Sequence, residues 1–430
     1  MSHTLKLKEF SFLIYGLGST GLSVINYFKK RKISSFSVWD DNIKLRKKFR
    51  SKNVSNLKIA LKNVDYIILS PGISLNKAKY KRDLRKFKKK IITDLDLFYL
   101  MNPKVKSIVV TGSNGKSTTC KIITHLLKKN KFNVELGGNI GTPVLNMRTK
   151  KNIFFVIEAS SFQLSHSKFI HPHFAILLNI TNDHVDWHGS MKAYIESKLK
   201  IFNLQKKNNF ALVNNKFRSI FKKKKYLSKL ISIKFEEYEK IKKNIKNNYL
   251  NSNINNENMN FVYTLSKLLN IKKKSFIQSM NSFIGLPHRY EIFLKKKNIT
   301  FINDSKATSF QATKFALASR KNIYWIVGGL PKDKDKIVLR HIKNNITQSY
   351  IIGKNVNFFK KQLKNKTKFT VSKNLRNAII KALRDIRLSK KINNTILLSP
   401  SAASFDQFIN FENRGNEFKK LSKIYAKRFI

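Results

Sequence analysis

The stretch Thr111–Thr118, with the sequence TGSNGKST, constrains the fold of this chain more than any other segment. It follows the apolar run Ser107–Val110 and precedes the helix-like segment Thr119–Leu127. A strand, a glycine loop, Lys-Ser and a helix in this order are typical of a nucleoside triphosphate site, because loop N–H groups and the helix N-terminus attract phosphate. Lys116 is expected to reach the outer phosphates and Ser117 to bind Mg²⁺. We therefore predict ATP binding here; the alternative is a plain strand-to-helix turn.

A second glycine-rich turn, Gly16–Gly21, lies near the N-terminus. It follows the predicted strand Ser11–Tyr15 and leads into a helix, and the next predicted strand, Phe36–Trp39, ends at Asp40. The pattern G-x-G-x-x-G with an acidic residue about 20 positions farther on is typical of a diphosphate-bearing nucleotide site, in which the acid holds a ribose. The pattern predicts a nucleotide-binding unit ahead of the ATP loop. A further turn, Ser70–Gly72, follows a third predicted strand and is read from the sequence alone as an ordinary turn.

Two polar segments follow predicted strands in the middle of the chain. Strand Ile153–Ile157 runs into Glu158, and strand Phe174–Ile180 runs into Thr181–His188, which holds two Asp and two His. A carboxylate at this edge of an α/β sheet suits a metal near phosphate. The segment Thr181–His188 leaves two interpretations open, a structural zinc site or contacts to Mg²⁺ and substrate. The lack of cysteines nearby and the adjacent phosphate loop favour the second.

Strands and helices alternate along most of the chain, which predicts three successive α/β domains over residues 1–103, 104–285 and 286–430. In the last domain the polar loops that follow the strands are the expected ligand face. Residues 205–258 are rich in Lys and Asn and suggest short strands and loops. Further predicted elements are the glycine-rich turn 136–141, helices 191–202, 259–269, 311–319 and 375–386, and strands 299–302, 324–327, 349–352 and 395–398.

The charge of the chain is unusual, with 87 lysine and arginine residues against 24 aspartate and glutamate residues and a formal net charge of +63. One interpretation is a nucleic-acid-binding ATPase, since basic surfaces attract phosphate backbones. The other is a compositional bias, because the basic residues are spread along the chain and form no single arm. We favour the second and expect no nucleic-acid partner. Such a field would still steer anionic substrates.

We expect neither a membrane-spanning helix nor a secretory signal. The sequence has no run of about 18 uncharged apolar residues, so no membrane insertion is expected. The N-terminal residues 1–6 lack a secretory apolar core. Cys120 is the single cysteine and cannot form an internal disulfide. These features predict a cytoplasmic protein.

Taken together, the motifs resemble the Mur ligase family of peptidoglycan synthesis over nearly the whole chain. TGSNGKST is similar to the ATP loop of that family, which also lacks the first glycine of the general pattern. Glu158–Gln163 and Asn182–His184 resemble its two Mg²⁺ segments, and Leu286–Arg289 resembles the junction before its third domain. Asn303–Thr308 and the long segment Ser399–Phe418 resemble the branch of the family that adds D-glutamate.

The resemblance implies an α/β architecture with a Rossmann-like N-terminal domain, a P-loop central ATPase domain and a Rossmann-like C-terminal domain. It implies an ATP-dependent ligase that joins D-glutamate to UDP-N-acetylmuramoyl-L-alanine through an acyl phosphate, releasing ADP and phosphate. We also expect the protein to be a monomer. A sister Mur enzyme or a folylpolyglutamate synthetase is the nearest alternative, and segments 303–308 and 399–418 argue against both.

The resemblance also assigns roles to residues at matching positions. The residues implied to bind ATP are Gly112, Ser113, Asn114, Gly115, Lys116, Ser117, Thr118, Asn258, Arg289 and Asp304. Two Mg²⁺ ions would lie among Ser117, Glu158, His184 and Lys198, the last as a carbamate formed with CO₂. The catalytic set would be Lys116, His184 and Lys198. The UDP-linked substrate would be bound by Ser19, Thr20, Asp40, Gly72 and Asn139, and D-glutamate by Lys306, Thr308, Lys332, Ser404 and Phe411.

The chain departs from the family pattern in one segment. The family sequence Gly-x-His-Asn-x-x-Asn corresponds to Ser252–Asn258, in which the Gly and the His are replaced. The contacts on the adenine side therefore stay open. Because Asp40 and Asp41 are adjacent, either of them could be the acid on the uracil side of the substrate.

Overall fold

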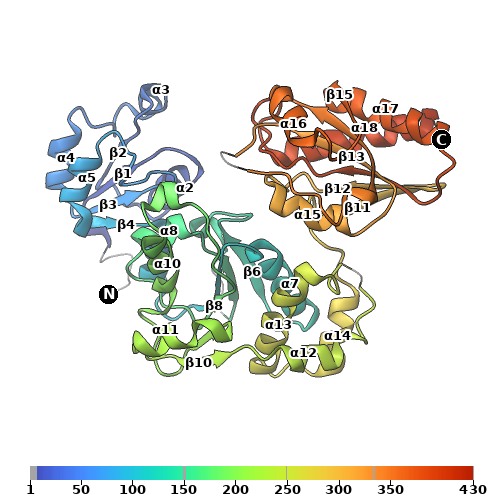
Figure 1. The fold of residues 1–430 in the computed structure, drawn as a ribbon. Coiled ribbons are helices and arrows are strands. Elements are labelled where there is room, and N and C mark those ends of the chain that lie inside the picture. The colour runs from blue at the N-terminus through green and yellow to red at the C-terminus, as the bar shows by residue number, and fades with distance from the viewer. Residues whose placement is uncertain (1–6, 149–151, 248, 333–334, 430) are drawn as a thin grey trace. The chain divides into compact units, whose positions relative to one another are not determined.

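The computed structural model describes residues 7–148, 152–247, 249–332 and 335–429, without the side chains of residues 253 and 254. The N-terminal segment 1–6, which was expected to carry no secretory signal, lies outside these residues. The chain divides into two compact units, Met1–Phe283 and Ile284–Ile430, and each is described by itself (Figure 1). Among the described residues the first unit holds two parallel sheets and the second holds one mixed sheet. The predicted boundaries at residues 103 and 285 stay predictions.

The first sheet has the strand order β2-β1-β3-β4, and all its strands are parallel. Its central strand β1 is buried along its whole length, as is usual in a parallel sheet covered on both faces. The glycine loop joins β1 to helix α2, and a Cβ on Gly21 would lie 1.9 Å from the carbonyl oxygen of Gly16, so the close approach of helix and loop requires glycine. The elements are β1 Phe12–Tyr15, α2 Ser19–Lys30, β2 Phe36–Trp39, α3 Ile43–Arg46, α4 Leu57–Asn63, β3 Tyr66–Leu69, α5 Lys81–Lys86 and β4 Ile91–Ile92.

The second sheet has the order β10-β9-β8-β5-β7-β6 and is also parallel. Its strands are β5 Lys106–Thr111, β6 Val134–Gly138, β7 Phe154–Glu158, β8 Phe174–Leu177, β9 Phe210–Val213 and β10 Lys229–Ser232. Its helices are α7 Lys116–Lys129, α8 Ser161–His166, α9 Val185–His188, α10 Met191–Leu199, α11 Arg218–Lys223, α12 Phe235–Lys242, α13 Asn253–Leu268 and α14 Lys273–Asn281.

Four expectations for this region need correction. Residues 136–141 are not wholly a turn, because the backbone as far as Gly138 pairs with β7 in strand β6. Residues 205–258 hold helices α11 and α12 as well as two short strands. Helix α13 begins at Asn253, six positions before the expected start, and α10 ends at Leu199, where a 3₁₀ turn continues the predicted helix. Each correction reflects packing or local hydrogen bonding that the apolar pattern alone does not encode.

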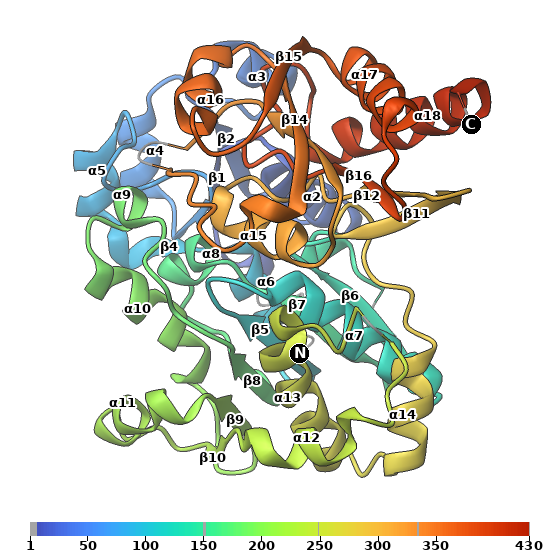
Figure 2. The same ribbon diagram turned by 45° about the vertical axis from the view of Figure 1, so that its right-hand side comes forward.

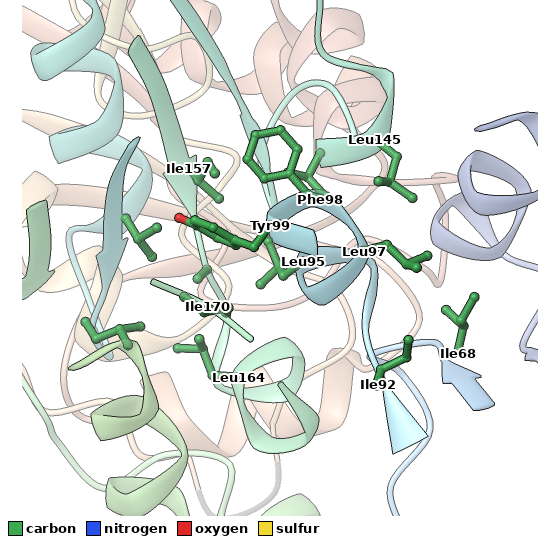
Figure 3. Close-up of a cluster of buried hydrophobic side chains, with 14 of the residues drawn as sticks. Ile68, Ile92, Leu95, Leu97, Phe98, Tyr99, Leu145, Ile157, Leu164 and Ile170 are labelled. Atoms are coloured by element: carbon green, nitrogen blue, oxygen red, sulfur yellow. The ribbon is translucent and has the colours of Figure 1, made fainter. Parts of the chain in front are cut away.

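Helix α6, Asp94–Met101, connects the first two sheets. Its first four apolar residues, Leu95, Leu97, Phe98 and Tyr99, are buried and point to different sides of the helix, and Figure 3 shows them in the middle of a cluster with side chains from both parts of the unit. A helix that is apolar all round belongs inside a core. Because this one core extends from the first sheet to the second, residues 7–283 form a single compact unit.

The sheet of the second unit has the order β11-β12-β16-β13-β14-β15, and only β11 pairs antiparallel among the described strands. Helices α17 and α18 pack on one face and α15 and α16 on the other, so the sheet has a hydrophobic core on each side (Figure 2). The elements are β11 Glu291–Lys296, β12 Ile299–Asn303, α15 Phe310–Ala318, β13 Ile323–Gly328, β14 Ile346–Ile352, α16 Val356–Leu363, β15 Phe369–Lys373, α17 Leu375–Leu388, β16 Asn394–Leu398 and α18 Phe411–Phe429. In the part of the chain that the structure describes, no helix has the length and apolar character needed to cross a membrane.

Candidate active site

The loop Thr111–Thr118 joins the carboxyl end of β5 to the N-terminus of α7, as predicted. Gly115 precedes α7 with φ +83°, and a Cβ there would lie 2.2 Å from Oδ1 of Asn258, so the loop depends on glycine at this position. Asn179 fixes the other half of the loop. Its carbonyl oxygen accepts from the N–H of Ser113 at 2.9 Å and its Oδ1 accepts from the N–H of Asn114 at 2.9 Å. The loop is therefore held in shape by the protein itself.

Two lysines converge on this loop. Lys116 Nζ donates to the carbonyl oxygens of Gly112 at 2.7 Å and Ser113 at 2.8 Å. Lys198, from α10, is buried and its Nζ donates to the same Gly112 oxygen at 2.8 Å. Burial, and secondarily the charge of Lys116, lower the pKa of Lys198 to about 6. Lys198 is therefore not a solvated surface lysine, unlike most lysines of this chain.

The predicted metal residues Glu158 and His184 lie at the end of strand β7 and immediately before helix α9, respectively. Glu158 is buried at the end of β7, its Oε1 accepts from Nδ2 of Asn139 at 2.8 Å, and its Oε2 has no hydrogen-bond partner among the described residues. His184 precedes α9 with φ +54°, a left-handed conformation that is uncommon outside glycine and is often found at functional sites. Its Nε2 lies 3.3 Å from Oδ2 of Asp183.

A buried carboxylate oxygen without a partner is a suitable ligand for a hard cation such as Mg²⁺, which commonly takes one or two protein carboxylates together with substrate phosphates. Glu158 and the hydroxyl of Ser117, at the start of α7, fit this kind of binding. Among the described residues no three or more His, Cys, Asp and Glu side chains are grouped so that they could hold a metal by themselves. The zinc interpretation of Thr181–His188 therefore finds no ligand cluster in these residues.

A cavity of about 580 Å³ lies between the first sheet and the second within the N-terminal unit. It is lined by all five residues expected to bind the UDP-linked substrate, which are Ser19, Thr20, Asp40, Gly72 and Asn139. Asp40 already accepts hydrogen bonds from the N–H groups of Leu17 at 2.7 Å and Asn42 at 2.8 Å, so it also fixes the glycine loop. The turn at Gly72 lines the cavity too, so its interpretation as an ordinary turn is incomplete.

Asp41, the alternative to Asp40 that the sequence left open, also lines this cavity. Two further lining residues, Asp94 and Gln163, were given no role from the sequence. Gln163 lies within a segment that the family resemblance had picked out. Asp94 belongs to no motif and lies at the start of α6, so α6 and β5 separate it in sequence from the phosphate loop. Only the packing of α6 brings it to the cavity.

In the second unit, several predicted ligand residues gather at the carboxyl ends of β12 and β16. Asp304 is buried, accepts from Ser399 Oγ at 2.7 Å and from the N–H of Tyr290 at 3.1 Å, and lies near the charge of Arg289. Lys306 Nζ lies over the ring of Phe411, 3.5 Å from its centroid. The remaining three predicted residues are Thr308, which is half-buried, Ser404, which is buried, and Lys332, which is exposed.

Arg414 is a buried residue of α18 that the sequence-based assignment also missed. Its Nη2 donates to the carbonyl oxygens of Ser305 at 2.8 Å and Ala402 at 3.0 Å, and its Nε donates to Ser305 Oγ at 3.0 Å. Ser305 belongs to segment 303–308 and Ala402 to segment 399–418. One guanidinium group therefore joins the two segments on which the family branch was predicted.

Comparison with known proteins decides the family. Residues 110–285 match the family model described as the Mur ligase middle domain, and residues 10–91 match that of the MurD-like N-terminal domain of Mur ligases. A curated relative from Rickettsia felis is 35% identical over 95% of this chain and 96% of its own length. The chain belongs to the Mur ligase family. The Rickettsia protein is named UDP-N-acetylmuramoylalanine–D-glutamate ligase, and so is a Buchnera aphidicola relative that is 36% identical over 96% of this chain and 97% of its own length.

Solved Mur ligase structures share the fold. The MurF ligase of Thermotoga maritima, solved in complex with ADP, aligns with a TM-score of 0.56 over 98% of this chain and 99% of its own, at 16% identity. The UDP-N-acetylmuramate–alanine ligase of the same organism aligns with a TM-score of 0.57 over 97% of this chain and 100% of its own, at 14% identity. The predicted α/β Mur ligase architecture, with parallel sheets in its N-terminal and central parts and a mostly parallel sheet in its C-terminal part, is confirmed.

Proposed function

We propose that this Mur ligase joins D-glutamate to UDP-N-acetylmuramoyl-L-alanine in peptidoglycan precursor synthesis, with conversion of ATP to ADP and phosphate. The observation that carries the proposal is the full-length similarity to relatives named UDP-N-acetylmuramoylalanine–D-glutamate ligase. The class, an ATP-dependent ligase, follows from the family. The cavity in the first unit supports the UDP-linked substrate as a ligand, because the five residues expected to bind it line one space.

The chemistry begins with activation of a carboxylate, which is a poor acceptor for an amine because it is negatively charged and has no good leaving group. The L-alanine carboxylate attacks the γ-phosphorus of ATP and becomes an acyl phosphate. Lys116 and the N-terminus of α7 stabilise the charge on the transferred phosphoryl group. Lys116 makes two hydrogen bonds to neutral carbonyl oxygens in this structure, and exchanging them for phosphate oxygens replaces weaker partners with charged ones.

Mg²⁺ would be held by Ser117, Glu158 and His184, and when bound it would supply positive charge beside the phosphates. Lys198 would complete the site as a carbamate. The neutral amine attacks CO₂, a C–N bond forms, one proton leaves to solvent, and the neutral side chain becomes a carboxylate-like anion. Burial supports this step, because it lowers the pKa of Lys198 to about 6 and keeps the amine neutral at physiological pH.

The second step is attack of the D-glutamate amine on the acyl carbon, after which phosphate leaves the tetrahedral intermediate. The ammonium groups of Lys306 and Lys332 suit the two carboxylates of D-glutamate, with Thr308, Ser404 and Phe411 as further contacts. Lys306 is held beside Phe411 before any ligand binds, which limits the side-chain freedom lost on binding. Arg289, Asp304 and Asn258 are assigned to ATP.

The test is an amino-acid specificity assay with the purified full-length chain, ATP, Mg²⁺ and UDP-N-acetylmuramoyl-L-alanine. Phosphate release is expected with D-glutamate and not with L-glutamate, L-alanine or diaminopimelate. Turnover with one of the other amino acids would instead support a sister ligase. Hydrolysis that requires DNA or RNA and falls steeply with salt would support the nucleic-acid-binding ATPase.

We further propose that the enzyme works as a cytoplasmic monomer. Its single cysteine, which is buried, supports a reducing compartment. Sedimentation velocity at several protein concentrations tests the monomer, and a mass that rises to twice that of one chain would contradict it.

A further inference from the structure

Asp94 is a buried carboxylate whose hydrogen-bonding capacity is only partly used by the protein. It is the first residue of α6 and its side chain is 2% exposed. Its Oδ1 has no hydrogen-bond partner among the described residues. Leaving a buried carboxylate oxygen unpaired is costly, so such an atom in a native fold calls for a ligand or another specific reason.

The neighbouring Asp96 provides an internal comparison. Its Oδ1 accepts from the N–H groups of Lys168 at 2.8 Å and Phe169 at 2.7 Å, and its Oδ2 accepts from the N–H of Thr93 at 2.9 Å. Both oxygens of Asp96 are therefore used, one to cap α6 and the other to hold the segment that follows α8. The fold thus satisfies one of two buried acids in the same helical turn completely and leaves an oxygen of the other unpaired.

The place of Asp94 shows what could use that oxygen. Asp94 lines the same cavity as the glycine loop and Asn139. Gln163 lies beside it, and because Gln163 Oε1 accepts from the backbone N–H and hydroxyl of Ser160, each at 3.1 Å, the amide NH₂ is the end available to Asp94. Burial raises the pKa of Asp94 to about 6, and the charge of Asp96 adds a smaller increase, while the N–H of Leu95 and the Gln163 side chain partly offset this by stabilising the carboxylate.

A carboxylate oxygen in this position selects for a hydrogen-bond donor. It would repel the diphosphate and the alanine carboxylate, which are the charged parts of the UDP-linked substrate. The part that carries neutral donors is the amino sugar, through its hydroxyl groups and its acetamido N–H. The glycine loop, with Ser19 and Thr20, occupies the nucleotide-binding part of the cavity, and Asn139 connects the cavity to Glu158 near the phosphate loop.

We propose that Asp94 accepts a hydrogen bond from the amino sugar of the substrate and so helps to orient its carboxylate toward the ATP site. This inference rests on the proposed function and adds a specificity-determining residue that no motif contains. Asp94 contributes to affinity for the sugar-containing part of the ligand and contributes nothing to the UDP part.

The experiment measures binding of two probes, UDP and UDP-N-acetylmuramoyl-L-alanine, to the full-length chain by calorimetry. Two variants are compared with the wild type. Asp94→Asn keeps the size of the side chain and removes its charge, and Asp94→Ser removes the carboxylate altogether. Asp83→Asn is the control, because it removes the same charge from the same part of the chain at a position outside the cavity lining. Both Asp94 variants are expected to lose roughly 10- to 100-fold in affinity for the full substrate, as for a hydrogen bond to a charged group, and to bind UDP as the wild type does.

Two results would overturn the inference. One is full-substrate affinity within about twofold of wild type in both Asp94 variants, which is less than a single neutral hydrogen bond provides. The other is an equal loss for UDP, which would mean general damage to the cavity. Failure of the proposed function looks different, because the wild-type chain itself would then not bind the UDP-linked substrate. Deoxy-sugar analogues identify the donor, since the analogue that lacks it binds equally to wild type and Asp94→Asn.

Discussion

Lys116 and Lys198 share one acceptor, the carbonyl oxygen of Gly112, yet their environments differ. Lys116 is half-buried beside the phosphate loop, whereas Lys198 is buried and has a pKa lowered to about 6. The two lysines therefore suit different tasks, one as a cation for phosphate and the other as a neutral amine for modification.

Lys116→Ala is expected to lower the ligation rate by at least about 10³-fold while the fold is kept, because a positioned charge at the transferring phosphoryl group is removed. Steady-state phosphate release measures the rate, and circular dichroism checks the fold. Turnover near that of the wild type would show that Lys116 does not stabilise the transferred phosphoryl group.

Lys198→Ala should lose activity and regain part of it when a short carboxylate such as acetate is added, since the small anion can take the place of the missing carbamate. Lys116→Ala is the matched control, because acetate cannot replace a cation. If acetate rescues neither variant, the carbamate proposal loses its main support.

Asp304 should make stability depend on pH. Burial raises its pKa to about 7, against about 4 in an unfolded chain, so the folded state holds this proton more tightly. Stability from this group is therefore complete below about pH 4 and is lost as the pH rises toward 7. Urea unfolding at pH 5 and pH 8 should show a smaller loss of unfolding free energy for Asp304→Asn than for the wild type. An equal loss in both proteins would assign the pH dependence elsewhere.

At the scale of elements, the phosphate loop packs directly against helix α13, because a Cβ on Gly115 would lie 2.2 Å from Oδ1 of Asn258. Gly115→Ala should destabilise the chain by about 1–3 kcal/mol and weaken ATP binding, because the new Cβ is strained and meets Asn258. Gly141→Ala is the matched control, since its φ is also positive, at +69°, but its nearest neighbour is 3.8 Å away. Adding Asn258→Ala should restore part of the stability lost in Gly115→Ala, as measured by thermal unfolding.

The sequence predicted those elements whose signal is local. Strands β5, β7 and β8 are continuous apolar runs bounded by turn residues, so they were found within a few residues of their true ends. Strand β6 was missed because Gly137 and Gly138 resemble a turn and form a strand only through pairing with β7. The candidate site divides in the same way. Motif residues such as Lys116 could be named from spacing, but Asp94 and Arg414 matter through contacts that only the folded chain creates.

At the scale of the whole molecule, the chain consists of two units that are stabilised separately. The core around α6 belongs to the first unit, and the two cores of the last sheet belong to the second. Residues 284–430 are therefore expected to fold when produced alone, with a cooperative thermal transition and dispersed NMR signals. A fragment that stays unfolded or aggregates would show that the second unit needs the first for stability.

Arg414 has a consequence for the exchange of specificity between enzymes. Its guanidinium group donates hydrogen bonds to both Ser305 and Ala402, so segments 303–308 and 399–418 hold each other in place although they lie about a hundred positions apart in sequence. A chimera that transplants segment 303–308 alone from a sister ligase would leave this arginine facing a foreign loop. Amino-acid preference should therefore transfer between Mur ligases only when segment 303–308 is grafted together with segment 399–418, which includes the start of α18 and Arg414.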